Sequence, residues 1–555
     1  MKLISIDFET YLISEEMPIP KPVCLSYYDG EHKGLITGQS NMHKFLKACL
    51  TNPKVKLIAH NAAFEGNVIA KWFPDLKAIY QQRLKTNHII CTKVYEQLID
   101  NNRKKAIHRY DLATLVNHYF EVDISEDKKN PDAWRLRYHE LDGIPKEKWP
   151  QEAIDYAIDD SIWAYKCYLE QKKFYIDIQL TVESDYYLNL MGTFGIRIDP
   201  ATVNLTEREL IGMLTPKYES LKKKGLVKVL KSGKYSKNVK ALREYIEKTF
   251  ENPVKTVKGS IATSKEHLEK YSEDPIIADY LAIMASEKIL TAFISRLKGA
   301  DTIRTQYNAC VSTGRTSSRT SQAFPSVNIQ QMPREVIGTT YDIRNCFIAR
   351  PGYHIVSIDY SGLEMTVCAN QLKAFLARDE MCNVINRGNT PTDMHSMLAY
   401  RIKNLKEVGH LDSNGVKIKP VTYEEFVSKK KEPGFKEYRQ LAKPINLGFP
   451  GGIGYDTMRS LLFKEGIIPK LVILNESRWE DKINKQVTHF RKEGHPVRCR
   501  RVAFDKYQLI WDELVLLKWE MFKLYPDLEE FLKEGHKRLL TGETKPQKNE
   551  WGEWE

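Results

Sequence analysis

The chain has 555 residues, 42% of them hydrophobic, which is enough for roughly three to four domains with a buried core each. Nine dispersed cysteines without a CxxC pair argue against a disulfide framework or a zinc site, and no run of about 18 apolar residues predicts a membrane span. Lysine and arginine number 84 against 72 acidic residues, and the resulting charge of +12 favours an acidic partner, most commonly nucleic acid. The start, MKLISIDFET, lacks the apolar run of a signal peptide, so we expect a cytoplasmic protein.

The first third of the chain alternates strand and helix patterns. Residues 1–10 and 54–60 have the composition of strands, and helical patterns alternate with strands to about residue 180, which predicts an α/β domain. Residues 181–300 are mostly helical and lysine-rich, and residues 274–297 have the spacing of a long amphipathic helix.

The patterns change after residue 300. Residues 312–334 form a loop rich in Ser, Thr, Gly and Arg, and the following segment 354–362, HIVSIDYSG, is predicted to be a strand that ends in a carboxylate. Residues 404–438 are rich in lysine and marked by Gly and Pro, which indicates an insertion between two helices. Residues 507–537 have a helical pattern.

Two acids, Asp7 and Glu9, stand two residues apart at the end of the first predicted strand. Side chains at i and i+2 of a strand point to the same face, so these carboxylates converge and repel each other unless a cation neutralises them. Oxygen ligands of this kind suit Mg²⁺ or Mn²⁺. A chance pair of surface acids would have the same spacing, so the pair needs support from other segments.

Two further segments give that support. Residues 60–65, HNAAFE, follow the second predicted strand and end in Glu65, and residues 156–160, YAIDD, place Tyr156 and Asp160 four apart on one helix face. Together with the D-x-E pair, these segments resemble the three motifs of the DEDD 3′–5′ exonucleases, in the branch that has a tyrosine in its third motif.

The resemblance implies a site with two divalent metal ions, one of which generates hydroxide while the other stabilises the leaving 3′ oxygen. By position, Tyr156 would orient the attacking water. The metal ligands implied are Asp7, Glu9, Glu65 and Asp160.

Glu65 departs from the family pattern, in which the second motif ends in aspartate. Its side chain is one methylene longer and has the same charge, so we expect metal binding in an altered geometry. The Y-x₃-D spacing selects Asp160 over its neighbour Asp159, and Asp111 is expected to be structural.

Residues 357–365, SIDYSGLEM, resemble motif A of the family A DNA polymerases, D-Y-S-x-x-E. By position, Asp359 would bind both metal ions of a polymerase site, and Tyr360 would contribute a backbone carbonyl to one of them. Glu364 would crowd the sugar 2′ position and exclude ribonucleotides.

The segments before motif A resemble the same family. TGRTSS at 313–318 and NIQQMPR at 328–334 resemble its T-G-R and N-L-Q-N-I-P segments, and IRNCF at 343–347 resembles its I-R-x-x-F. These segments contain Arg, Asn and Gln, whose side chains hydrogen-bond phosphates and the acceptors of the minor groove. The residues implied to contact primer–template DNA are Arg315, Asn328, Gln330 and Gln331.

Two later segments resemble the nucleotide-binding part of that family. In TDMHSMLA at 392–399, His395 would approach the triphosphate of the incoming nucleotide. RQLAKPINLGFPGG at 439–452 resembles motif B, and its Arg439 and Lys443 lie on one helix face. They would bind the phosphates, and Lys443 could protonate the leaving pyrophosphate.

Motif B also departs from the pattern. Leu447 stands in the nucleotide-binding position where the family has Phe or Tyr, and Gly451 replaces a second aromatic residue. Pro444 lies inside the expected helix and removes a backbone hydrogen bond, which predicts a kinked or shortened helix.

The family's last motif, an H-D-E on a hairpin, has no counterpart that we accept. The similar segment WDEL at 511–514 lies too early in the chain for this motif, and it has a helical pattern where the motif needs a hairpin. The gene could be split, with a second polypeptide carrying this motif, the sequence could be truncated or interrupted, or the polymerase half could be degenerate. We favour a split or interrupted gene, and the resemblance is to a phage-type enzyme, which would work in the host cytoplasm.

The resulting fold prediction is multidomain, α/β and α+β. It has an RNase H-like exonuclease domain at 1–180, a thumb and connecting helices at 181–340, and a partial palm and fingers at 341–555. The predicted function is a template-directed DNA polymerase with a proofreading 3′–5′ exonuclease. Its ligands would be primer–template DNA, dNTPs and two Mg²⁺ or Mn²⁺ ions per active site, and a processivity factor is a further candidate partner. The alternatives are a standalone exonuclease and a non-catalytic DNA-binding subunit.

Overall fold

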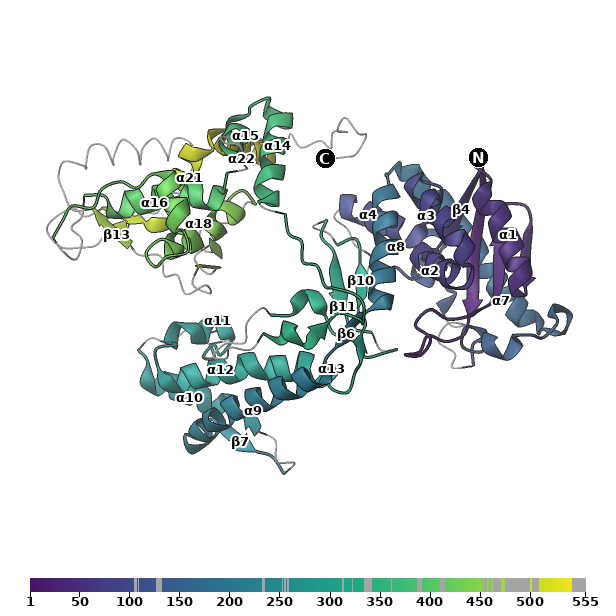
Figure 1. Ribbon diagram of the computed structural model, residues 1–555, viewed down its shortest axis with the longest axis horizontal. Coiled ribbons are helices and arrows are strands. Elements are labelled where there is room, and N and C mark those ends of the chain that lie inside the picture. The colour runs from purple at the N-terminus through teal and green to yellow at the C-terminus, as the bar shows by residue number, and fades with distance from the viewer. Residues whose placement is uncertain are drawn as a thin grey trace. The chain divides into compact units, whose positions relative to one another are not determined.

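The computed structural model divides into two compact units, one ending at Ile355 and one beginning at Val356 (Figure 1). It describes the chain except for residues 104–106, 108, 126–131, 232–234, 252, 254–255, 257–258, 312–313, 322, 334–341, 361, 387–391, 410–414, 452, 454–456, 459–460, 463–470, 475–499, 502–508 and 542–555. Among the described helices, none combines the length and apolar character that crossing a bilayer requires.

The first unit begins with a five-stranded mixed sheet of order β3-β2-β1-β4-β5. Its strands are β1 (Lys2–Thr10), β2 (Pro22–Tyr28), β3 (Lys33–Thr37), β4 (Val55–Ala59) and β5 (Ile89–Cys91). The central strand β1 is antiparallel to β2, where Asp7 pairs with Ser26, and parallel to β4, where Ile4 pairs with Leu57. The expected strands at 1–10 and 54–60 and the α/β character of this region are confirmed.

Successive side chains of β1 point to opposite faces of the sheet. Ile4, Ile6 and Phe8 are buried in a core shared with α1, α2 and α3. The intervening residues face the long helix α7, and the Ser5 hydroxyl donates to the Ser161 carbonyl of that helix at 2.7 Å. The helices of this region are α1 (Gln39–Thr51), α2 (Ala62–Trp72), α3 (Lys77–Lys85), α4 (Thr92–Arg103), α5 (Leu112–Phe120) and α7 (Gln151–Gln171). Asp7 and Glu9 therefore face α7, because they share the period of Ser5.

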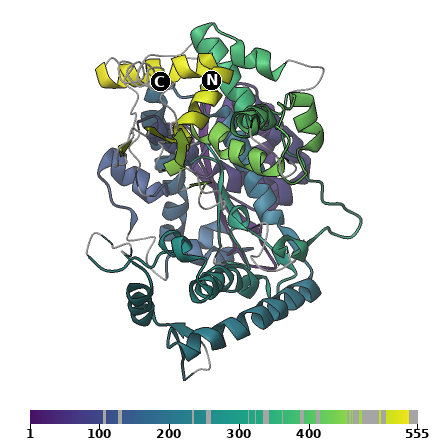
Figure 2. The same ribbon diagram turned by 90° about the vertical axis from the view of Figure 1, so that its left-hand side faces the viewer.

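The rest of the first unit is mainly helical, as expected for residues 181–300. Its helices are α8 (Gln179–Phe194), α9 (Pro200–Lys223), α10 (Val239–Thr249), α11 (Lys265–Leu268), α12 (Pro275–Ile289) and α13 (Ser295–Leu297). Asp199 and Asp274 cap α9 and α12, and each is followed by a proline at the first helical position. Helices α9 and α12 pack side by side, as Figure 1 and Figure 2 show. The long helix expected at 274–297 forms with a π turn between α12 and α13.

Short strands complete the first unit. They form a sheet of β12 (Phe347–Ile348), β6 (Ile196–Ile198) and β9 (Thr302–Ile303), a hairpin of β7 (Val227–Val229) and β8 (Tyr235–Lys237), and a pair of β10 (Gln306–Asn308) and β11 (Ser317–Arg319).

The second unit is built from helices around one apolar core. They are α14 (Leu363–Leu376), α15 (Glu380–Ile385), α16 (Met394–Glu407), α17 (Tyr423–Lys429), α18 (Lys436–Gly448), α21 (Glu513–Leu524) and α22 (Pro526–Thr541). A small sheet has the order β13 (Leu471–Leu474), β15 (Leu509–Asp512), β14 (Arg500–Arg501). The expected insertion at 404–438 lies between α16 and α18 and contributes a helix of its own, α17.

Three local expectations need correction. Residues 354–360 are exposed and belong to no strand of the described chain, because an apolar alternating segment becomes a strand only where a neighbour accepts its hydrogen bonds. Residues 509–512 form a strand, not a helix, because they pair with both β13 and β14. Pro444 does not shorten α18, which continues to Gly448, so that half of the expectation is wrong, while a kink stays a prediction.

Candidate active sites

Strand β1 and helix α7 bring three carboxylates together. Ligand oxygens of Asp7, Glu9 and Asp160 all lie within 4.8 Å of one another, with Glu9 buried and the other two half-buried. We call these residues the carboxylate trio. Three like charges at this separation repel one another unless a cation or protons neutralise them. The donor set is made of hard oxygen atoms and therefore fits Mg²⁺ or Mn²⁺.

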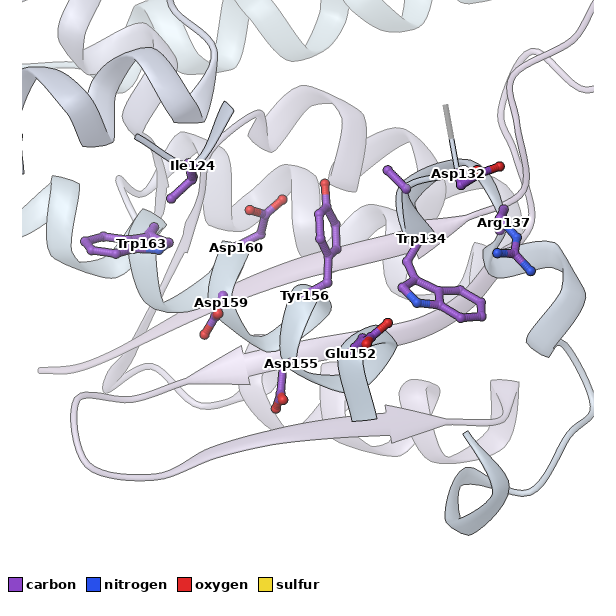
Figure 3. A pocket seen from close by; sticks show the side chains of 11 residues that line it. Ile124, Asp132, Trp134, Arg137, Glu152, Asp155, Tyr156, Asp159, Asp160 and Trp163 are labelled. Carbon is purple, nitrogen blue, oxygen red and sulfur yellow. The ribbon is translucent and has the colours of Figure 1, made fainter. Parts of the chain in front are cut away.

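Helix α7 directs its neighbouring acidic side chains to two different sides. Figure 3 shows the Asp160 carboxylate and the Tyr156 hydroxyl on one side of α7, whereas Asp155 and Asp159 point to the other side. This separation follows from the helical period, since residues four apart share a face. It agrees with the choice of Asp160 over Asp159.

Tyr156 stays protonated in these surroundings. Burial raises the pKa of its hydroxyl, and the negative charges of Asp160, Glu9 and Asp7 raise that pKa further. A protonated hydroxyl next to carboxylates is available as a hydrogen-bond donor to a water molecule or a phosphate oxygen.

Glu65 lies near the trio but outside it. It is in the first turn of α2, directly after β4, at the edge of the sheet where β1 also ends. Only 3% of the residue is exposed, and its Oε2 atom has no hydrogen-bond partner in the described part of the chain. Burial, followed by the charge of Asp7, raises the pKa of Glu65 well above its usual value. Its role as a metal ligand remains a prediction.

A half-buried cation whose charge acts on Glu65 was not expected from the sequence. Lys93, at the start of α4, donates to the Asn61 amide oxygen at 2.7 Å and lies 3.2 Å from Asp185 of α8. The three residues come from segments far apart in the chain, so no local sequence motif predicts their contact. Asp111, by contrast, accepts from the Thr114 amide as the cap of α5, which confirms its structural role.

A cavity of about 580 Å³ adjoins Tyr156 and Asp160. Trp134 and Trp163 line it, and the Arg137 guanidinium lies 4.7 Å from the Trp134 ring centre (Figure 3). The aromatic faces suit the bases of a single strand. The lining also contains several carboxylates, among them Asp132 and Glu152, so a phosphate would need metal ions to neutralise their charge. No motif or spacing in the sequence predicts that these residues line a common cavity.

The second unit gathers the residues expected to bind nucleotide. His395 lies on α16, and Arg439, Lys443 and Leu447 lie on α18, which packs against α16. Burial lowers the pKa of His395, and the charges of Arg439 and Lys443 lower it further against the opposing effect of Asp393 and Glu364. A neutral His395 therefore lies among cations, next to the buried Asn446 at 3.4 Å.

The site residues of the expected motif A are exposed and form no cluster of metal-ligating side chains in the described chain. Asp359 and Tyr360 lie in the exposed segment before α14, and Glu364 is exposed in the first turn of that helix. Within the described residues Asp359 joins no group of three metal-ligating side chains. The charge of Glu364 acts on His395, and the role of Asp359 stays a prediction.

The expected DNA-binding residues lie close together around β11. Asn328 caps a short turn of 3₁₀ helix by accepting from the Gln331 amide at 3.3 Å, and it also accepts from Ser318 at 2.6 Å. Gln330 donates to Thr316 at 2.8 Å, and Arg315 is exposed beside it. Their contact with DNA remains a prediction.

The fold and these two sites define a class: an α/β domain with a nuclease-type carboxylate site, followed by helical segments with a cluster of cations. Comparison with known proteins identifies both parts. Residues 2–172 match the family model of a 3′-5′ exonuclease, and residues 225–426 match that of DNA polymerase family A. The chain therefore combines a region that is similar to 3′–5′ exonucleases with a region that is similar to DNA polymerase family A.

Individual relatives agree with this assignment. The chain is 26% identical over 285 residues to DNA polymerase I of Aquifex aeolicus, a match that covers 48% of the chain and 42% of the relative. It is 26% identical over 270 residues to DNA polymerase I of Chloroflexus aurantiacus, covering 45% and 27%. The chain thus spans less than half the length of these relatives.

A solved structure has a similar fold. It is the POL domain of Pol1 from M. smegmatis in complex with DNA primer-template and dNTP. The TM-score is 0.52 at 16% sequence identity, and the match covers 95% of this chain and 82% of that one.

Proposed function

We propose that the protein is a template-directed DNA polymerase with a proofreading 3′–5′ exonuclease of the tyrosine-containing DEDD type. The geometry gives the most support to the exonuclease. The observation that carries it is the carboxylate trio, with the Tyr156 hydroxyl on the same side of α7 as Asp160.

In this proposal each residue has a distinct task. The trio would hold two Mg²⁺ ions, which supply an activated water and neutralise charge on the phosphate. Tyr156 donates a hydrogen bond that orients the attacking water, because its raised pKa keeps the hydroxyl protonated. Trp134 and Trp163 hold the bases at the end of a single strand by stacking. Glu65 adds a fourth carboxylate.

Replacement of one trio residue tests this function. We expect Asp7→Ala to lower degradation of a single-stranded 3′ end by roughly a thousandfold or more, because metal binding is lost. Asp159→Ala is the control, since it removes the acid next to Asp160 on α7, which points to the other side of that helix and is not part of the trio. Degradation by Asp7→Ala at the wild-type rate would reject the site.

A specific observation supports DNA synthesis as the second activity. Arg439 and Lys443 on α18 lie near His395, within the unit that contains the expected motif A. In this proposal Asp359 and Tyr360 bind the metal ions, Glu364 excludes ribonucleotides and Leu447 contacts the nucleotide. We further propose a second polypeptide that supplies a carboxylate to Asp359, and a phage-type replicative setting.

Primer extension separates these possibilities. The full chain is incubated with primer–template DNA, dNTPs and Mg²⁺, with and without a candidate second polypeptide that carries an H-D-E motif. We expect extension with that polypeptide, weakened at least tenfold by Lys443→Ala, while Lys436→Ala on the same helix serves as control. Salt-dependent DNA binding without extension or degradation would instead indicate a non-catalytic DNA-binding subunit.

A further inference from the structure

The inserted segment between α16 and α18 reaches the expected nucleotide site. Its helix α17 ends at Lys429, and the next residue, Lys430, places its Nζ atom 3.1 Å from the Oδ2 atom of Asp393. Asp393 is two residues before His395 and caps α16 by accepting from the Ser396 amide. Lys430 is therefore brought to the helix terminus that carries His395.

Asp393 holds two cations at once. Its Oδ2 atom accepts from Lys430 at 3.1 Å and from the Arg439 guanidinium at 3.1 and 3.2 Å. Burial alone would raise the pKa of Asp393, but Arg439, Lys430 and Ser396 outweigh it and lower the pKa to about 2. The ionised carboxylate thus fixes Lys430 and Arg439 side by side, although two cations without it would repel each other.

The charges at this point do not balance. One carboxylate faces two cations that it binds, and Lys443 lies one helical turn after Arg439. The side chains of Lys430 and Arg439 remain 33% and 35% exposed, so both keep donors that a ligand can reach. An excess of positive charge that a carboxylate positions but does not neutralise is suited to an anion with several charges.

The inserted segment has packing contacts and hydrogen bonds that do not involve Lys430. Phe426 of α17 is fully buried and lies 5.5 Å from the Phe435 ring. Asn404 exchanges two hydrogen bonds with Val421, both 2.9 Å long. Thr422 caps α17 by accepting from the Glu425 amide. The Asn404 hydrogen bonds attach the segment to α16, the other contacts lie within the segment, and none of them involves Lys430.

We propose that Lys430 is an additional phosphate-binding residue of the nucleotide site, contributed by the inserted segment. Together with Arg439, it binds the terminal phosphates of an incoming deoxynucleoside triphosphate. This inference rests on the proposed polymerase function and adds a residue outside the motifs that imply that function.

Binding of nucleotides of different phosphate length tests the inference. The full chain is titrated by calorimetry with dATP, with dAMP and with inorganic tripolyphosphate. We expect Lys430→Ala to weaken dATP and tripolyphosphate binding roughly tenfold, because a charged hydrogen bond is lost, and to leave dAMP binding unchanged. Lys430→Arg keeps the charge and should retain most of the affinity.

Lys429→Ala is the matched control. It removes the same charge from the adjacent position, but Lys429 pairs with Glu425 at 3.0 Å and does not contact Asp393. If the wild type binds dATP and the two alanine variants are indistinguishable, the role of Lys430 is overturned while the nucleotide site stands. If the wild type binds neither dATP nor tripolyphosphate, the nucleotide site itself is rejected, and the inference with it.

Discussion

Lys93 shows how a single residue can connect the candidate exonuclease site to the rest of the first unit. Its ammonium group lies between Asn61, which follows β4, and Asp185 of α8. The Asp185 side chain is only 5% exposed, so its charge depends on Lys93 for compensation. A buried charge whose partner is removed is strongly destabilising, whereas removing both partners is not.

We therefore expect Lys93→Met to lower the free energy of unfolding by about 3 kcal/mol, because the Asp185 carboxylate is left buried and unpaired. Urea denaturation of the metal-free chain measures this loss. The double variant Lys93→Met/Asp185→Leu should regain most of the stability. Equal stability of Lys93→Met and wild type would contradict the pairing.

At the scale of elements, α8 depends on a glycine to approach the strands of the second half of the unit. A Cβ atom on Gly192 would meet the Thr305 carbonyl oxygen at 2.2 Å and the Tyr307 ring at 3.2 Å. Gly212 in α9 has no neighbour within 4 Å of such an atom. The two glycines share a helical setting but differ in packing.

This contrast predicts opposite effects of one substitution. Gly192→Ala should destabilise the protein by roughly 1–3 kcal/mol, because a rigid backbone oxygen has to move. Gly212→Ala should stabilise it by up to about 1 kcal/mol, through the higher helix propensity of alanine. Thermal unfolding followed by circular dichroism measures both. A loss of stability in Gly212→Ala, or none in Gly192→Ala, would contradict the close contact.

At the scale of the whole molecule, the boundary between the two units falls in the exposed segment before α14. Ile355, Val356 and Ile358 are 60%, 74% and 86% exposed, and the described chain pairs none of them in a strand. Segments without regular hydrogen bonding are cleaved most readily by proteases.

Limited proteolysis with chymotrypsin should therefore cut after Tyr353 and Tyr360, which are 69% and 76% exposed. Mass spectrometry of the products would show a fragment that ends at one of these residues. Replacing both tyrosines by serine should remove that fragment and leave other cuts unchanged. Resistance of the wild-type segment would mean that it is paired in solution.

The sequence by itself determined the features that depend on local spacing. The period of two in β1 placed Asp7 and Glu9 on one face, and the period of the helix separated Asp160 from Asp159. The motif order identified the two parts of the chain, which the family comparisons confirm at residues 2–172 and 225–426. These properties need no knowledge of distant contacts.

Only the tertiary structure decided the features that depend on distant partners. The pairs Lys93–Asp185 and Lys430–Asp393 join residues 92 and 37 positions apart, for which no local pattern exists. The segment at 354–360 has the composition of a strand but no partner in the described chain, and residues 509–512 have a helical pattern yet pair as a strand. A strand is completed by hydrogen bonds to another segment, so its composition alone cannot determine it.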